Sequence, residues 1–175
     1  MKKLFFAAAL IGLTLISCGD DDSNPTTVNV SIDGTWNLTG FTLDNAIDLN
    51  GDGVASTDMV NETDCYSNSE LVFTSATEVS LMLEGLDIEV SGNGNDITLT
   101  VDCLAAETLT GTYTVTENTV TLSGEIGNQG EDVVMVRSGN TLSVEFNEIQ
   151  SIPIDGPNGT TFFDVVGGTV TFTKQ

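Results

Sequence analysis

Apolar and polar residues alternate along most of the chain from Gly34 onward, and Val and Thr are frequent in the alternating runs. A period of two places successive side chains on opposite faces of a strand, so the pattern predicts half-buried antiparallel strands. Turn-forming residues separate the runs by short distances, which favours hairpins joined in a meander of about nine or ten strands. The expected inward-facing residues are Trp36, Leu38, Phe73, Leu81, Leu83, Tyr113, Val115, Leu142 and Phe146.

The first strand contains a change of phase. Trp36 and Leu38 alternate in one phase and Phe41 and Leu43 in the other, so we expect a bulge or bend at Gly40.

Two longer segments, residues 44–68 and 147–161, break the alternation, and we expect irregular structure there. Residues 56–62 are the one helical candidate, with a turn or two at most. An all-β meander with one apolar face hides that face by closing into a barrel, and a sandwich of two sheets is the alternative. We assign this single domain to residues 33–175.

The N-terminus has the features of a secretory signal. Two lysines precede an apolar run that is too short to span a membrane comfortably, and residues 1–17 form the predicted signal peptide. The sequence "LISC" that ends at Cys18 resembles the lipobox of bacterial lipoproteins. That resemblance implies acyl chains such as palmitate on Cys18, and membrane attachment through this lipid.

Residues 18–32 are polar and acidic, and we interpret them as a flexible tether. Their acidic run resembles the export signal of surface lipoproteins in some diderm bacteria. We therefore expect attachment to the outer membrane, on the periplasmic or the cell-surface face.

Loss of the signal peptide makes the charge more extreme. Two of the four basic residues leave with it and all 26 acidic residues remain, so the mature chain has a formal net charge of −24. Such a chain repels nucleic acid and anionic membrane surfaces. The charge by itself identifies no partner protein.

Cys65 and Cys103 are the cysteines left once Cys18 carries lipid. An even pair in an exported domain predicts one disulfide.

The opening "GTWNLTGFTLD" resembles the Gly-x-Trp strand of lipocalin-like domains, in which the Trp plugs the closed end of the barrel. The order of lipobox, acidic tether, Gly-x-Trp strand, acidic loop before a Cys, the hairpin "GTYTVTENTVTLS" and a final "VTFTK" strand is similar to lipocalin-like lipoproteins of diderm bacteria. The chain differs from secreted lipocalins in its shorter strands, in the long insert after the first strand, and in lacking a basic residue at the closing position before the last strand. These differences argue against a deep ligand cavity.

The residue types available restrict the chemistry. The chain has no His, which excludes a catalytic triad and imidazole metal ligands, and both mature thiols are expected to be oxidised. We therefore expect no enzymatic activity. The inward-facing residues form either a packed core, which suits a structural or display protein, or a pocket for a small apolar ligand that is neutral or cationic, because few cations are available to hold an anion. The candidate pocket residues are Trp36, Leu38, Phe73, Leu81, Tyr113 and Phe146.

The stretch "DLNGDGVASTDM" is similar to the first half of a calcium loop. Calcium prefers six to eight oxygen ligands from a flexible loop. The twelfth position, where an acid is expected, is Met59, and Asp, Asn and Gly are also ordinary turn residues. A structural Ca²⁺ site and a polar turn are both compatible with this pattern. The candidate ligands are Asp48, Asn50, Asp52, the carbonyl of Val54, and Asp58.

Overall fold

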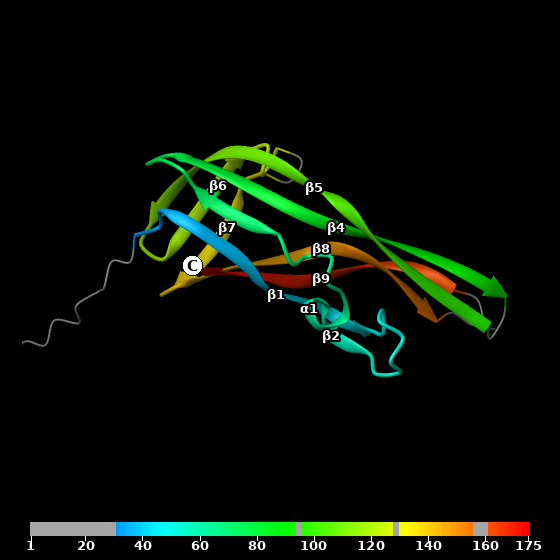
Figure 1. Cartoon of the computed structure of the whole chain (residues 1–175). Helices are drawn as coiled ribbons and strands as arrows, with labels where there is room; N and C mark the ends of the chain where they lie inside the picture. Colours follow the sequence, from blue (N-terminus) through cyan, green and yellow to red (C-terminus); the bar gives the residue numbers. More distant parts are fainter. Residues whose placement is uncertain (1–30, 94–95, 128–129, 156–160) are drawn as a thin grey trace, which may run out of the picture.

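The structure is a computed structural model that describes residues 31–93, 96–127, 130–155 and 161–175. The predicted signal peptide, Cys18 and most of the tether lie outside these residues. In this described part of the chain, nine strands and one short helix follow in order (Figure 1). They are β1 (Gly34–Ile47), β2 (Ser56–Asp58), α1 (Met59–Glu62), β3 (Glu70–Phe73), β4 (Glu78–Asn93), β5 (Asp96–Thr116), β6 (Thr119–Gly124), β7 (Val133–Ser138), β8 (Thr141–Asp155) and β9 (Thr161–Lys174).

Eight of the strands close into an antiparallel barrel. The sheet order is β1-β3-β4-β5-β6-β7-β8-β9, and β9 pairs back onto β1, while β2 pairs with β1 outside this circle. Closure satisfies the hydrogen-bonding edges that an open sheet would leave exposed. The predicted all-β meander closed into a barrel is confirmed, and the two-sheet sandwich is not formed.

Changes of phase in the sequence coincide with bulges in the strands. The register between β1 and β9 shifts between Leu38 and Gly40, as the change of phase predicted. The register between β4 and β5 shifts in the same way between Leu83 and Gly85. Because each extra residue reverses the alternation, apolar side chains on both sides of a bulge remain directed into the barrel.

Several strands are longer than the sequence suggested. β4 has 16 residues, β5 has 21 and β8 has 15, so the expectation of short strands is wrong. Residues 147–155 belong to β8 instead of forming an irregular segment, and a register shift between Phe146 and Gln150 accommodates them. A bulge interrupts the alternation without ending the strand, which is why the pattern looked irregular.

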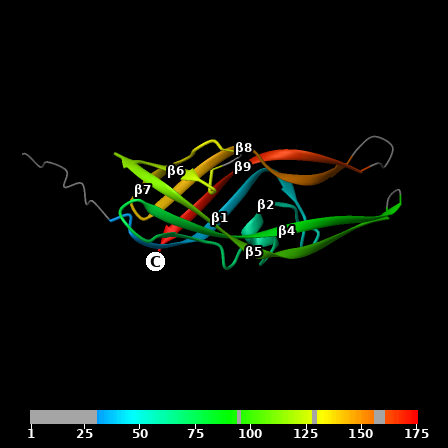
Figure 2. The ribbon, with the colours of Figure 1, turned by 90° about the horizontal axis from the view of Figure 1, so that it is seen from above.

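The hairpins β4–β5 and β8–β9 project beyond the barrel on the same side, away from the C-terminus (Figures 1 and 2). The chain therefore has one compact end, where residue 31 and the C-terminus lie, and one end extended by long hairpins.

The insert between β1 and β3 packs against the barrel wall. Leu49, Met59 and Tyr66 are buried in the same core as the barrel residues. The buried Glu62 carboxylate accepts hydrogen bonds from the backbone N–H groups of Leu49 and Asn50, at 2.9 and 3.4 Å. The insert therefore has its own anchoring contacts, although β2 and α1 contribute few residues.

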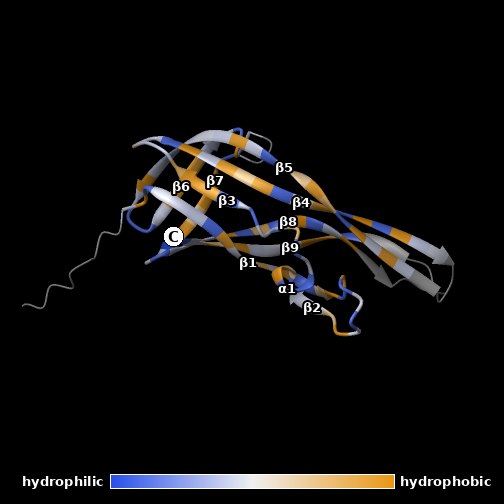
Figure 3. Ribbon diagram, viewed as in Figure 1, coloured by the Kyte–Doolittle hydropathy of each residue, from blue (hydrophilic) through white to orange (hydrophobic). Residues whose placement is uncertain are grey.

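Hydrophobic and hydrophilic residues alternate along the barrel strands (Figure 3). Val115 was expected to face inward but is 43% exposed. It pairs with Val120 beside the β5–β6 turn, at the very end of the barrel, where solvent reaches the side chain. Within the described residues no helix is long and apolar enough to cross a membrane.

Candidate functional site

One end of the barrel is filled by aromatic side chains. Trp36 on β1 has no exposed surface, and its indole N–H donates a hydrogen bond to the Ile32 carbonyl at 2.8 Å. Phe73 packs edge-on against Trp36, with ring centroids 6.2 Å apart, and Tyr113 packs edge-on against Phe73 at 4.7 Å. The Tyr113 hydroxyl donates to the Ser75 carbonyl at 2.9 Å. We call Trp36, Phe73 and Tyr113 the aromatic plug.

Two basic residues cover the Trp36 ring. The Arg137 guanidinium carbon lies 5.8 Å from the ring centroid, and the Lys174 Nζ lies 5.7 Å from it. Lys174 Nζ also donates to the Ser31 carbonyl. The sequence showed no basic residue at the usual closing position, but Arg137 on β7 and Lys174 on β9 lie over the Trp36 ring from other strands, and β9 pairs directly with β1.

The other half of the barrel contains a cavity of about 490 Å³. Its wall is mostly apolar and comes from β1, β3, β4, β5, β6, β7, β8 and β9, together with Tyr66 from the insert. A cavity of this size and character is in the range of small-molecule sites. Residues of the cavity wall include Leu38, Phe41, Leu71, Leu81, Leu109, Leu122, Ile126, Met135, Val144, Phe146, Val170 and Phe172.

The six candidate pocket residues divide between the two halves of the barrel. Leu38, Leu81 and Phe146 line the cavity. Trp36, Phe73 and Tyr113 belong to the aromatic plug at the closed end of the barrel. The separation follows from position along the strands: residues near the start of β1, the end of β3 and the end of β5 meet at the closed end. The alternation in sequence indicates which face a side chain takes, but not its height in the barrel.

Sequence reasoning missed the polar members of the cavity lining. They include Glu84, Glu125 and Glu148, and no basic residue is found among the described residues that line the cavity. Glu148 could have been found, because it occupies the next inward position after Leu142, Val144 and Phe146. Glu84 lies at the β4 bulge and Glu125 in the loop after β6, where alternation carries no information.

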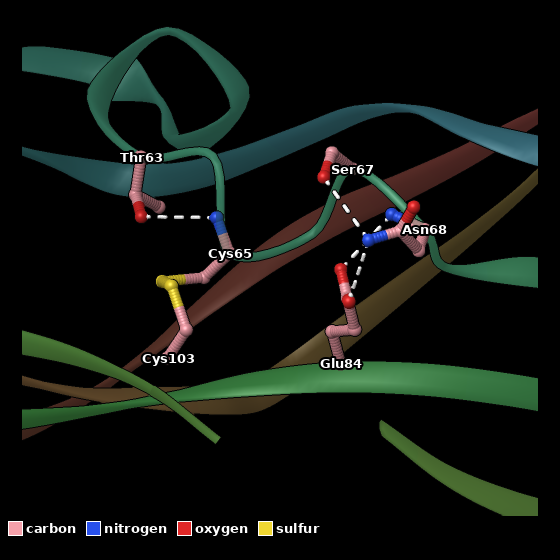
Figure 4. The surroundings of a disulfide bond; sticks show 6 residues. All are labelled: Thr63, Cys65, Ser67, Asn68, Glu84 and Cys103. Carbon is pink, nitrogen blue, oxygen red and sulfur yellow. Dashed lines mark hydrogen bonds between the residues drawn. A yellow bond between two sulfur atoms is a disulfide. The ribbon is translucent and has the colours of Figure 1, made fainter. Parts of the chain in front are cut away.

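A disulfide fastens the insert to the barrel beside this cavity. Cys65 and Cys103 are bonded, with Cα atoms 5.0 Å apart, as predicted (Figure 4). Cys103 lies on β5 and Cys65 in the insert, immediately before Tyr66. The Tyr66 ring packs edge-on against Phe41, with centroids 5.0 Å apart. The bond thus holds Tyr66 in the cavity wall.

The segment from Asp48 to Asp58 is a network of turns. Asp48 accepts hydrogen bonds from the N–H groups of Gly51 and Gly53, both at 2.8 Å. The side chains of Asn50 and Asp52 each accept from the backbone N–H two residues later, at 2.9 and 2.7 Å.

Asp58 makes a separate contact. It accepts from the Val60 N–H as the cap of α1, at 3.1 Å. In the described part of the chain no three acidic or cysteine side chains come together as a metal site. Calcium binding by Asp48, Asn50, Asp52, Val54 and Asp58 stays a prediction.

These features define the class of protein: an up-and-down antiparallel barrel, closed at one end by a buried Trp and hollow at the other, an architecture that fits the binding of a small molecule. The family model described as "Lipocalin-like domain" matches residues 32–144, well over half of the chain, so the chain belongs to the lipocalin-like domain family. No curated protein and no solved structure matches the chain significantly.

Proposed function

We propose that this protein is a lipid-anchored outer-membrane lipoprotein whose barrel binds a small, largely apolar molecule. The observation that carries the binding proposal is the cavity of about 490 Å³, whose wall is mostly aliphatic and aromatic. A packed interior would have favoured a structural or display role, because nothing could then enter the barrel. Burial of an apolar ligand in such a cavity supplies the driving force, at about 25 cal/mol for each Å² removed from water.

The chain's chemistry supports binding without catalysis. Lipocalin-like proteins are generally non-catalytic binding proteins. The chain has no His, and Cys65 and Cys103 are joined in a disulfide, so neither is a thiol nucleophile. The strongly acidic charge also supports the exclusion of nucleic acid from the set of ligands.

The position of the tether supports an orientation for the anchored domain. Ile32 and Ser31 are held at the closed end, because their carbonyls accept hydrogen bonds from Trp36 and Lys174. The cavity lies in the half of the barrel beyond the aromatic plug. With Cys18 in the membrane, the chain enters the domain at its closed end, and the cavity half lies on the side away from this entry point.

Displacement of a neutral fluorescent probe, N-phenyl-1-naphthylamine, tests the binding proposal. Val133 lines the cavity, whereas its neighbour Val134 is 52% exposed on the outer surface. We expect wild type and Val134→Trp to take up the probe, and Val133→Trp to lose most of the signal because the larger side chain occupies the cavity. Equal uptake by all three folded proteins, as judged by thermal melting, would place the binding elsewhere.

Intact-mass analysis of protein extracted from the membrane tests the anchor. We expect a chain that begins at Cys18 and carries acyl chains, and a Cys18→Ser variant that is not acylated. Cleavage at another bond, or an unmodified Cys18 in the wild type, contradicts the lipoprotein proposal.

Protease treatment of intact cells tests which face the domain occupies. On the surface-export proposal, wild type is degraded from outside. Substitution of the acidic run by Asp20→Ala, Asp21→Ala and Asp22→Ala then protects the domain by retaining it in the periplasm. Protection of the wild type in intact cells, lost once the outer membrane is opened, assigns the domain to the periplasmic face.

A further inference from the structure

The polar residues of the cavity lining are predominantly acidic. Glu84 on β4, Glu125 in the loop after β6 and Glu148 on β8 line the cavity from three separate parts of the barrel, and we call them the rim carboxylates. The basic residues of the described chain, Arg137 and Lys174, lie at the other end of the barrel against Trp36. The charges of the barrel are therefore segregated, with the cations at the aromatic plug and carboxylates at the cavity.

Two of the rim carboxylates are held by the protein. Glu84 accepts hydrogen bonds from the Asn68 backbone N–H and side-chain amide, at 2.9 and 2.8 Å (Figure 4). Glu125 accepts from the Thr110 hydroxyl and backbone N–H, at 2.9 and 3.2 Å, and these hydrogen bonds lower the pKa of Glu125. The contacts of Glu125 favour its ionised carboxylate, since a charged acceptor makes the stronger hydrogen bond.

The backbone beside Glu125 is shaped by glycines. β5 and β6 approach so closely that a Cβ on Gly111 would lie 2.2 Å from the Ser123 carbonyl oxygen. The paired Gly124 has a φ of 99°, which side-chain-bearing residues rarely adopt. The chain leaves β6 through this conformation, and Glu125 thereby reaches Thr110 across the β5–β6 pair.

The rim carboxylates are not arranged as a metal site. Metal binding requires several oxygen ligands around one point, at distances of about 2.0–2.6 Å. Within the described residues no group of three acids is close enough for this. Carboxylates spread around an apolar cavity instead suit an organic cation, which meets negative potential over a wide area while its apolar part is buried.

Tyr66 adds an unpartnered polar group to the wall. Its side chain is only 5% exposed, and no hydrogen bond of its hydroxyl is found among the described residues. No fully buried side-chain polar atom in the described chain lacks a partner, so the Tyr66 hydroxyl has accessible surface. Because Tyr66 lines the cavity, we take this surface to face the cavity, where it is available to a ligand.

We propose that the ligand is an amphiphilic amine, with an apolar body in the cavity and a protonated amino group that is attracted by the rim carboxylates and hydrogen-bonded by the Tyr66 hydroxyl. This inference rests on the proposed binding function and specifies its ligand class. An amine with N–H groups satisfies both elements, whereas an alkyl carboxylate would meet like charge.

Three ligands with the same alkyl chain, decylammonium, decanol and decanoate, compete against bound N-phenyl-1-naphthylamine in the test, all below their micellar concentrations. We expect decylammonium to bind about tenfold more tightly than decanol, since each exposed ion pair adds only a few-fold. Decanoate binds more weakly than decanol. Added salt weakens decylammonium binding and leaves decanol nearly unchanged.

Two variants with the same net charge distinguish an effect of the rim carboxylates on amine binding from an effect of the chain's overall negative charge. In the rim variant, Glu84, Glu125 and Glu148 are replaced by Gln. In the control variant, Glu89, Glu107 and Glu145, which are exposed and outside the cavity lining, are replaced by Gln. We expect the rim variant to lose about tenfold in decylammonium affinity and the control less than about twofold, with decanol affinity unchanged in both.

Tyr66→Phe tests the hydroxyl while keeping the ring against Phe41. We expect about a threefold to tenfold loss of decylammonium affinity, the usual effect of one hydrogen bond. Unchanged affinity overturns the assignment of Tyr66.

The outcomes distinguish the two levels of the proposal. If all three ligands bind but decylammonium has no advantage over decanoate, or the control variant loses as much as the rim variant, the amine inference is wrong and the binding function stands. If neither decanol nor decylammonium displaces the probe, both proposals fail.

Discussion

At the closed end of the barrel, Trp36 has no exposed surface and Phe73 and Tyr113 pack against it, whereas at the other end apolar side chains surround a cavity of about 490 Å³. Both ends are built from the same strands with the same alternation. They differ in side-chain size and in position, because three aromatic rings fill the closed end and mainly aliphatic residues line the cavity. Close packing contributes stability, so we infer that the closed end stabilises the barrel and the other end is available for binding.

The largest expected effect is the loss of the central plug residue. Trp36→Ala removes a fully buried ring and should lower the free energy of unfolding by about 3–5 kcal/mol. Phe146→Ala, in the cavity wall, should cost less than half as much, because one side of the ring already borders open space. Urea unfolding followed by circular dichroism measures both. Equal losses would contradict the contrast between the two ends.

The disulfide tests how firmly the insert belongs to the cavity half. Cys65 and Cys103 are 38 residues apart, and removal of a cross-link of this span should cost about 3–4 kcal/mol on the chain-entropy model. Replacement of both residues by Ser avoids a stray thiol. We also expect weaker uptake of N-phenyl-1-naphthylamine, since Tyr66 is no longer held in the wall. A variant as stable as wild type would show that other contacts already fix the insert.

The two tyrosines of the chain allow a direct comparison of the two ends, because Tyr66 lines the cavity and Tyr113 belongs to the aromatic plug. Burial raises the pKa of Tyr66 above its ordinary value of 10.0. Burial, and to a smaller degree the Asp33 carboxylate, raises the pKa of Tyr113. A tyrosine whose pKa is higher in the folded than in the unfolded state contributes stability that is fully present below pH 10.0. This contribution is lost as the pH rises from 10.0 through the folded-state pKa.

Phenolate absorbance is followed against pH in Tyr66→Phe and Tyr113→Phe, so that the remaining titration in each variant is assigned to one tyrosine. Unfolding experiments at increasing pH measure the loss of folding stability that accompanies each titration. We expect each variant to lose less stability above pH 10.0 than wild type does. A tyrosine that titrates at its ordinary pKa would show that its end of the barrel is more exposed to solvent than the structure describes.

The smallest expected effect concerns the turn network of the insert, which lies outside both ends of the barrel. If Asp48, Asn50 and Asp52 bind calcium weakly, calcium at a concentration equal to its Kd should stabilise the protein by only about 0.4 kcal/mol. Thermal melting of wild type and Asp52→Ala, each with calcium and with chelator, detects this stabilisation. We expect calcium to raise the melting temperature of wild type only. Identical melting curves would leave the loop a polar turn.

The sequence by itself indicated the strands, favoured closure into a barrel over a sandwich, and predicted the cross-link. Alternation with a period of two leaves one apolar face that a meander must bury, and the change of phase at Gly40 located a bulge. Trp36 was expected to plug the barrel because of the Gly-x-Trp opening, and it is fully buried. Cys65 and Cys103 were expected to bond because Cys18 is assigned to lipid, and the bond is present.

Only the tertiary structure decided which inward residues pack and which line a cavity. Alternation gives the face of a strand, but the height of a residue in the barrel depends on stagger and bulges across all the strands. The same closure brought Arg137 and Lys174 over Trp36 from β7 and β9, and gathered Glu84, Glu125 and Glu148 around one cavity. These contacts join residues far apart in the chain, and local pattern contains no information on them because they arise only when β9 pairs with β1.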